Sequence, residues 1–125
     1  MLLLLSGCLS TVPPEEGGVA TWALAPDSAI GPDATEFTAM VTEQACASGQ
    51  TSAGRVIGPS VELTDDAVTV TFRVRPLAGA QECPGNPPTP VVVRLDEPLG
   101  GRTLLDGGRE PPAQPPVCAN PQSCE

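Results

Sequence analysis

Residues that interrupt regular structure recur so often along this chain that few folds remain open to it. The sequence contains 16 prolines and 13 glycines among 125 residues. Proline removes a backbone hydrogen-bond donor and clashes with the preceding turn of a helix, so a helix needs a longer proline-free amphipathic run than this chain offers. No window keeps a helical period beyond two turns. The sequence therefore predicts an all-β chain built from short strands.

The clearest strand lies at 67–75, where four apolar residues alternate with threonine and arginine. This period of two is typical of an antiparallel strand with one buried face and one face in water. Asp65 and Asp66 precede it as a tight turn, so 60–64 and 67–75 are expected to form a hairpin. The other expected strands are 20–24, 36–46, 55–57, 91–95 and 102–105. Six or seven short strands with frequent turns predict a small antiparallel β-sandwich or partial barrel.

The chain is long enough for one domain, and its proline- and glycine-rich ends narrow that domain further. We expect a β-domain over 19–108, preceded by a flexible tether at 8–18 and followed by a proline-rich tail at 109–125. Trp22, Phe37 and Phe72 are the whole aromatic supply. The core must therefore be built from valine, leucine, alanine and isoleucine around three rings, and covalent cross-links should matter to it.

The amino terminus combines an apolar run with small residues, ending Leu5-Ser6-Gly7-Cys8. This tetrapeptide resembles the lipobox of bacterial lipoproteins. The resemblance implies that residues 1–7 are a short, truncated-looking signal peptide, that the signal peptidase cuts before Cys8, and that the Cys8 thiol receives a diacylglycerol. It places the domain on the extracytoplasmic face of the cell membrane, anchored by lipid.

Four cysteines remain beyond Cys8, an even number suited to an exported, disulfide-stapled domain. Three pairings are open, and we favour Cys46–Cys83 and Cys118–Cys124. The first would join the end of a strand to a proline-rich loop, and the second would close a small ring in the tail. A zinc site is the alternative, but the chain has no histidine and no Cys-x-x-Cys spacing.

The stretch from Cys46 to Gly108 contains CPGNPPTP at 83–90 and LDEPLGGRTLLDG at 95–107. It resembles uncharacterised small lipoproteins of high-GC Gram-positive bacteria. This resemblance implies a compartment and paired cysteines, and it implies no activity.

The formal net charge is −9, with no lysine and no histidine. An acidic surface repels phosphate backbones, so nucleic acid is not an expected partner. Without histidine or lysine there is no usual base to activate a serine or cysteine nucleophile. The sequence thus favours a protein without catalysis, metal or cofactor, although Asp66 and Asp96 leave a small hydrolase with a carboxylate pair as an alternative. Acids around Asp65 or around Asp106 could in principle bind Ca²⁺, but acids at turns have an ordinary structural role.

A stiff proline-rich loop is the expected interaction surface, because loops carry function more often than strands and this one costs little to order. Its candidate residues are Pro84, Asn86, Pro87 and Pro88. Arg102 is expected in a surface salt bridge with neighbouring acids, and the tail is interpreted as a spacer. The sequence predicts a monomeric binding or envelope-accessory module whose partner is an envelope protein or a small ligand. A purely structural spacer in the envelope is the first alternative.

Overall fold

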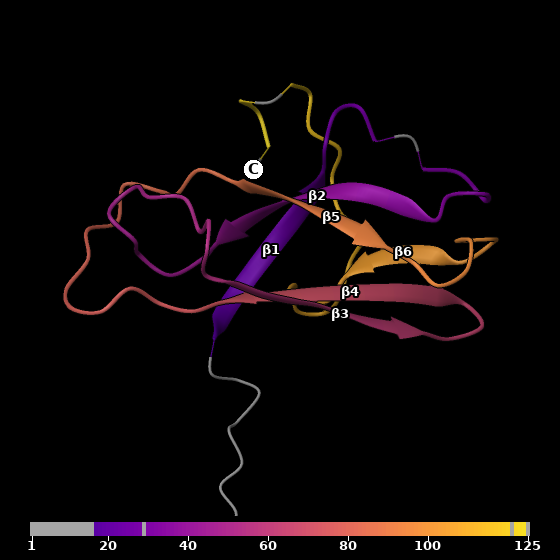
Figure 1. Ribbon diagram of the computed structural model, residues 1–125, viewed down its shortest axis with the longest axis horizontal. Helices are drawn as coiled ribbons and strands as arrows, with labels where there is room; N and C mark the ends of the chain where they lie inside the picture. Colours follow the sequence, from indigo (N-terminus) through magenta and orange to yellow (C-terminus); the bar gives the residue numbers. More distant parts are fainter. Residues whose placement is uncertain (1–16, 29, 121, 125) are drawn as a thin grey trace, which may run out of the picture.

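The computed structural model describes residues 17–28, 30–120 and 122–124. Within them it contains strands and turns but no helix, which confirms the all-β prediction (Figure 1). The six strands are β1 (Gly18–Leu24), β2 (Glu36–Glu43), β3 (Val56–Leu63), β4 (Ala67–Val74), β5 (Thr89–Arg94) and β6 (Thr103–Asp106).

The strands form one curled sheet in the order β3-β4-β1-β2-β5, with antiparallel neighbours. β3 and β5 are its two edges and do not pair with each other, so the partial barrel among the expected architectures is the observed one. β1 pairs with only the last two residues of β4 and then diverges from it. β6 occupies the space left beside the first half of β4.

β6 runs parallel to β4, so the expectation of a wholly antiparallel sheet is wrong for this strand. A parallel pair needs a long crossover connection, and here β5 and its following loop separate the two strands in sequence. The loop returns the chain to the end at which β4 begins, where the Thr103 N–H donates to the Asp66 carbonyl at 2.9 Å.

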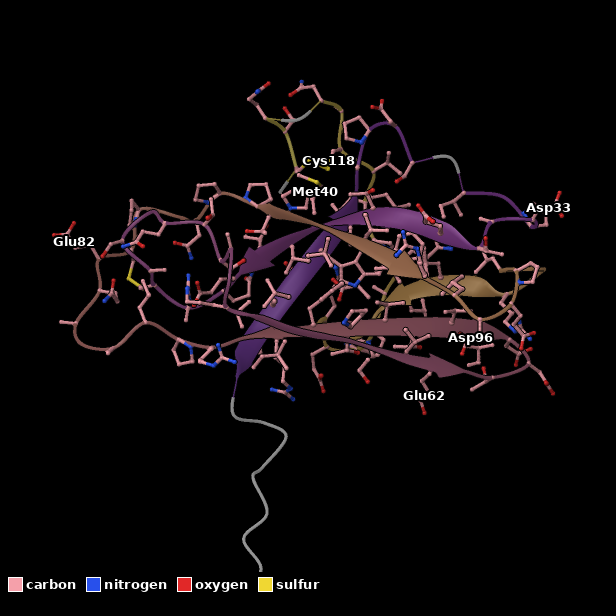
Figure 2. All side chains as sticks on the ribbon, viewed as in Figure 1. Asp33, Met40, Glu62, Glu82, Asp96 and Cys118 are labelled. Atoms are coloured by element: carbon pink, nitrogen blue, oxygen red, sulfur yellow. A yellow bond between two sulfur atoms is a disulfide. The ribbon has the colours of Figure 1, made fainter. Side chains whose placement is uncertain are left out.

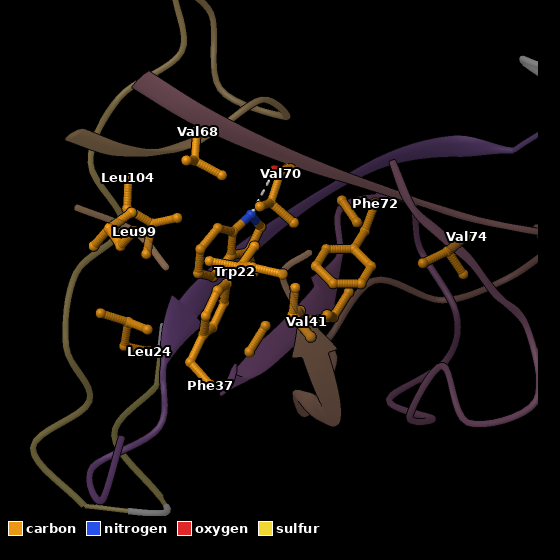
Figure 3. Packing of buried hydrophobic residues seen from close by; sticks show 14 residues of the cluster. Trp22, Leu24, Phe37, Val41, Val68, Val70, Phe72, Val74, Leu99 and Leu104 are labelled. Carbon is orange, nitrogen blue, oxygen red and sulfur yellow. Dashed lines mark hydrogen bonds between the residues drawn. The ribbon is translucent and has the colours of Figure 1, made fainter. Parts of the chain in front are cut away.

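The core lies inside the curl and centres on the three aromatic rings (Figure 3). Trp22 stacks on Phe37 with ring centroids 5.4 Å apart and meets Phe72 edge-on at 6.3 Å. The Trp22 indole N–H donates to the Val70 carbonyl at 2.8 Å, which satisfies its buried polar atom. Valines, leucines and alanines fill the remaining volume, as the composition predicts.

Several predicted strand boundaries are corrected. The expected strands 55–57 and 60–64 are one strand, β3, which continues through Gly58 and Pro59. Gly58 has φ +108°, and the pairing register shifts between Ile57 and Ser60, so a bulge absorbs the two residues at the sheet edge. The strand expected at 36–46 ends at Glu43, and the one at 67–75 ends at Val74. The strands expected at 91–95 and 102–105 are observed as Thr89–Arg94 and Thr103–Asp106.

The proline-rich tail is packed against the domain rather than acting as a spacer over its described residues. Leu24 pairs with Val117 beyond the end of β1, and the Cys118 N–H donates to the Leu24 carbonyl at 2.9 Å. Ala113 likewise pairs with Asp106. The bonds to Leu24 use backbone groups at the end of β1 that would otherwise lack a strand neighbour, and the Ala113 pair does the same at the end of β6.

Both favoured disulfides are present, Cys46–Cys83 and Cys118–Cys124. The second closes what we call the C-terminal ring, the loop at 118–124. Its two cysteines are buried and pack on Ala23 and Met40, on the face of the sheet opposite the main core. Figure 2 shows Met40 and Cys118 next to each other there. No helix in the described part of the chain has the length and hydropathy needed to cross a membrane.

Candidate functional site

A groove of about 870 Å³ lies over the outer face of β1 and β2. Its floor includes Thr21, Thr42 and Gln44. One wall is the loop Cys83–Pro88, which we call the proline loop, and the opposite side is formed by Arg109 and the C-terminal ring. All four residues predicted as an interaction loop line this groove, namely Pro84, Asn86, Pro87 and Pro88. The fold thus brings two disulfide-closed segments, far apart in sequence, to one concavity.

The proline loop is fixed to the end of β2 by two kinds of bond. The Cys46–Cys83 disulfide joins it to the residues after the strand. The Asn86 side-chain amide donates to the carbonyls of Glu43 at 3.0 Å and Ala45 at 2.7 Å. The Asn86 Oδ1 is buried and has no hydrogen-bond partner among the described residues. Asn86 is therefore a positioning residue that holds the loop in a single arrangement over the floor.

A buried ion pair stabilises the same end of β2. Arg55 Nη2 contacts Glu43 Oε1 at 2.8 Å and Arg55 Nη1 contacts Glu43 Oε2 at 3.1 Å, a two-pronged geometry. The Glu43 side chain is only 2% exposed. Arg55 also donates to the carbonyls of Arg75 at 2.7 Å and Thr51 at 3.0 Å. This one guanidinium therefore ties β2 to the loop after it and to the end of β4.

Asp106 organises the other side of the groove. It is fully buried, and its Oδ2 accepts the Trp22 backbone N–H at 2.9 Å and Arg109 Nε at 3.0 Å. Its Oδ1 accepts the Gly108 N–H at 2.8 Å. Burial raises the pKa of Asp106, and the hydrogen bonds from Trp22, Gly108 and Arg109 offset part of that rise. The carboxylate thereby links β6 to β1 and sets where Arg109 enters the groove.

The groove is electrically neutral and suited to hydrogen bonding. Its charged lining residues, Glu43 and Arg109, are each paired within the protein. Threonine and glutamine supply donors and acceptors, while prolines and alanine supply apolar surface. The three aromatic rings are buried in the core and do not line it. Its chemistry matches an uncharged ligand rich in amides or hydroxyls more closely than a flat ring or a phosphate.

The other candidate sites considered from the sequence do not lie in the groove. Asp66 and Asp96 are exposed and do not line the groove. The described residues contain no group of three or more histidine, cysteine, aspartate or glutamate side chains placed to hold a metal. Arg102 forms the expected surface salt bridge, with Glu97 at 3.2 Å. The lipidation candidate Cys8 lies outside the described residues.

Sequence reasoning missed the residues that hold the groove in place, although a signal for two of them existed. Glu43 continues the inward series of β2 after Phe37, Ala39 and Val41, and Asp106 follows an inward leucine on β6. A charged residue at an apolar position of a period-two strand indicates a buried, paired charge. Arg55 and Arg109 carry no local signal, because their partners are distant in sequence or depend on a turn.

Comparison with protein-family models, with curated proteins and with solved structures finds no match to this chain. Function is therefore argued from the groove and its chemistry.

Proposed function

We propose that this protein is an exported, lipid-anchored binding module without catalysis of its own, and that its groove holds an uncharged segment rich in amides or hydroxyls. The observation that supports this most directly is the convergence of the proline loop and the C-terminal ring on one neutral concavity. A structural spacer has no need for such a groove, whereas ligand sites are concave with a few convergent polar groups.

Two disulfides support an oxidising compartment, which agrees with export. Placement of the domain ends supports anchoring from the amino-terminal side. β1 begins at the lower margin of the view in Figure 1, and the C-terminal tail lies at the upper margin. A tether attached ahead of Gly18 would therefore join the domain at the side away from the C-terminal tail.

Anchoring is tested by intact mass of the protein expressed with its native upstream region, beside the Cys8→Ala variant. The expected result is loss of residues 1–7 and a diacylglycerol adduct that the variant lacks. An unlipidated chain that keeps Met1 would overturn the anchor and leave the groove proposal to its own test.

Groove binding is tested by two-dimensional NMR with capped, uncharged pentapeptides of alanine, asparagine, serine and threonine as probes. We expect shift changes at Thr21, Thr42, Gln44 and the Asn86 side-chain amide. Thr42→Arg should abolish them, because a long charged side chain on the floor fills the groove. Thr35→Arg is the matched control, since Thr35 is exposed just before the opposite end of β2. Absence of shifts at millimolar probe, or shifts that survive Thr42→Arg, would contradict the assignment.

A further inference from the structure

β3 is the outer edge of the sheet and lies away from the groove. It has one neighbour, β4, and residues 58–63 are exposed at every position. Val61 and Leu63 are 38% and 37% exposed, although both are large apolar residues. Unpaired edge strands are ready templates for another chain, and natural proteins usually cover or blunt them.

The register of the hairpin shows which backbone groups point away from β4. The Thr64 N–H donates to the Ala67 carbonyl at 2.9 Å, which makes that pair a hydrogen-bonded one. Hydrogen-bonded and non-hydrogen-bonded pairs alternate along an antiparallel ladder. The backbone N–H and C=O groups of Glu62 and Ser60 therefore point toward β4. The N–H and C=O groups of Val61 and Leu63 consequently point outward. Among the described residues they make no hydrogen bond outside the strand ladder.

The side chains of the same two residues lie on the core side of the sheet. Val61 is directly opposite Val70, and Leu63 is opposite Val68, and both partners are buried in the core. Cross-strand partners project from the same face, so Val61 and Leu63 form an uncovered rim of the core. A strand added beside β3 would satisfy the outward backbone groups and bury this rim at once.

The exposed edge of β3 is limited at both ends, and these limits set the length of a strand that could pair with it. Pro59 has no N–H and sits in the bulge at one end. At the other end β3 stops at Leu63, before the exposed turn of Asp65 and Asp66, and the Thr64 carbonyl beside that turn accepts Arg102 Nε at 2.9 Å. The open segment is therefore 60–63, which matches a short strand of about five residues rather than a whole sheet edge.

The negative charges near this edge favour a basic partner. Glu62 points from the opposite face of β3, and Figure 2 shows it directed away from the sheet at the lower margin of the molecule. Asp65 and Asp66 follow in the exposed turn, and none of these three acids is in a salt bridge within the described part of the chain. A second copy would bring the same acids to the same edge and be repelled, whereas a basic segment would be attracted.

We propose that residues 60–63 of β3 accept a short extended segment of a basic partner polypeptide as an added strand. Its apolar side chains lie over Val61 and Leu63, and its lysine or arginine side chains lie beside Glu62 on the other face. The partner thus carries alternating apolar and basic residues. This surface is independent of the groove and of the ligand proposed for it.

The probe is a capped, fluorescein-labelled peptide, Thr-Lys-Val-Lys-Val-Lys-Thr, followed by anisotropy against the folded domain. Glu62→Lys should weaken binding at least about tenfold, since it replaces attraction by repulsion. The double variant Val61→Thr with Leu63→Thr should weaken it by a similar factor. Val92→Thr is the matched control, because Val92 is 48% exposed on the other edge strand, β5, and should leave binding unchanged.

The second probe is methylated at the backbone nitrogens of alternate residues, those whose N–H groups would point toward β3. This change should abolish binding, because strand addition depends on main-chain hydrogen bonds. Thr42→Arg should not affect binding of the unmethylated probe, which separates this surface from the groove. The proposal is overturned by equal affinity of the methylated probe, by loss of binding in Val92→Thr, or by no anisotropy change at millimolar domain. It is also overturned if sedimentation detects a domain dimer that Glu62→Lys abolishes, since a second copy then occupies the edge.

Discussion

Replacing Asp106 by asparagine tests whether this buried carboxylate holds β6 and the start of the tail against β1. All three of its partners are donors, from Trp22, Gly108 and Arg109. Asparagine keeps the shape but turns one oxygen into an NH₂ group, so at least one donor then faces another donor. A buried donor left without its acceptor costs about 1–3 kcal/mol.

Burial opposes the charged form of Asp106, so loss of the charge adds little to that cost. We therefore expect Asp106→Asn to lower the free energy of unfolding by about 2 kcal/mol. Asp106→Ala, which removes all three acceptor contacts and leaves a void, should lower it by about 4 kcal/mol.

The assay is urea denaturation followed by fluorescence of Trp22, the single tryptophan, whose backbone N–H is one of the three donors. Asp96→Asn is the control, because Asp96 is an exposed turn residue and the same change there should stay within about 0.5 kcal/mol. A loss below that limit in Asp106→Asn would refute the assignment of Asp106 as an anchor.

The pH dependence gives a second readout of the same group. Burial raises the pKa of Asp106 above its reference value of 3.8, so the folded state holds this proton more tightly than the unfolded chain. The resulting stability is fully present below about pH 3.8 and is lost as pH rises through the folded pKa. The unfolding free energy of the wild type minus that of Asp106→Asn should accordingly fall across this window. A difference that rises with pH would show that the hydrogen bonds outweigh burial.

Three further stability predictions concern the Arg55–Glu43 ion pair and the two disulfides that hold the segments around the groove. Arg55→Ala should lower the free energy of unfolding by about 3–5 kcal/mol, because it leaves the Glu43 carboxylate buried and unpaired. Arg94→Ala is the control: it breaks an exposed ion pair and should lower the same quantity by less than about 1 kcal/mol in the same urea titration. Replacing both Cys46 and Cys83, which are 37 residues apart, by serine should lower the free energy of unfolding by about 4 kcal/mol. An unchanged urea concentration at the unfolding midpoint would contradict this. The same double change in the C-terminal ring, with a separation of six residues, should cost about 2 kcal/mol.

Local sequence pattern determined the secondary-structure class and most of the strands. The alternation along β4 places its valines and Phe72 inside whatever the neighbours are, because side chains of a strand alternate between two faces. The aromatic core was predictable because the apolar volume is scarce, and the favoured cysteine pairing, one of three that the sequence left open, is the observed one.

The proline loop was predictable as a surface feature, but the groove was not. Its floor, its second wall and Arg109 come from β1, β2 and the tail, which are separated in sequence from the loop by tens of residues. The tail was interpreted as a spacer because proline-rich composition favours extended chain. Its packing on Ala23 depends on an unpaired end of β1 that composition does not reveal.

The sequence by itself thus determined that the chain is all-β and which faces of its strands are apolar; it favoured one of three cysteine pairings, and the tertiary structure selected that one. The tertiary structure alone decided that β6 runs parallel to β4, that Glu43 and Asp106 are buried beside arginine partners, and that β3 is left as an open edge. The division has a physical reason. Strand patterning depends on residues a few positions apart, whereas pairing order, buried charges and free edges depend on contacts between segments that meet only after the chain has folded.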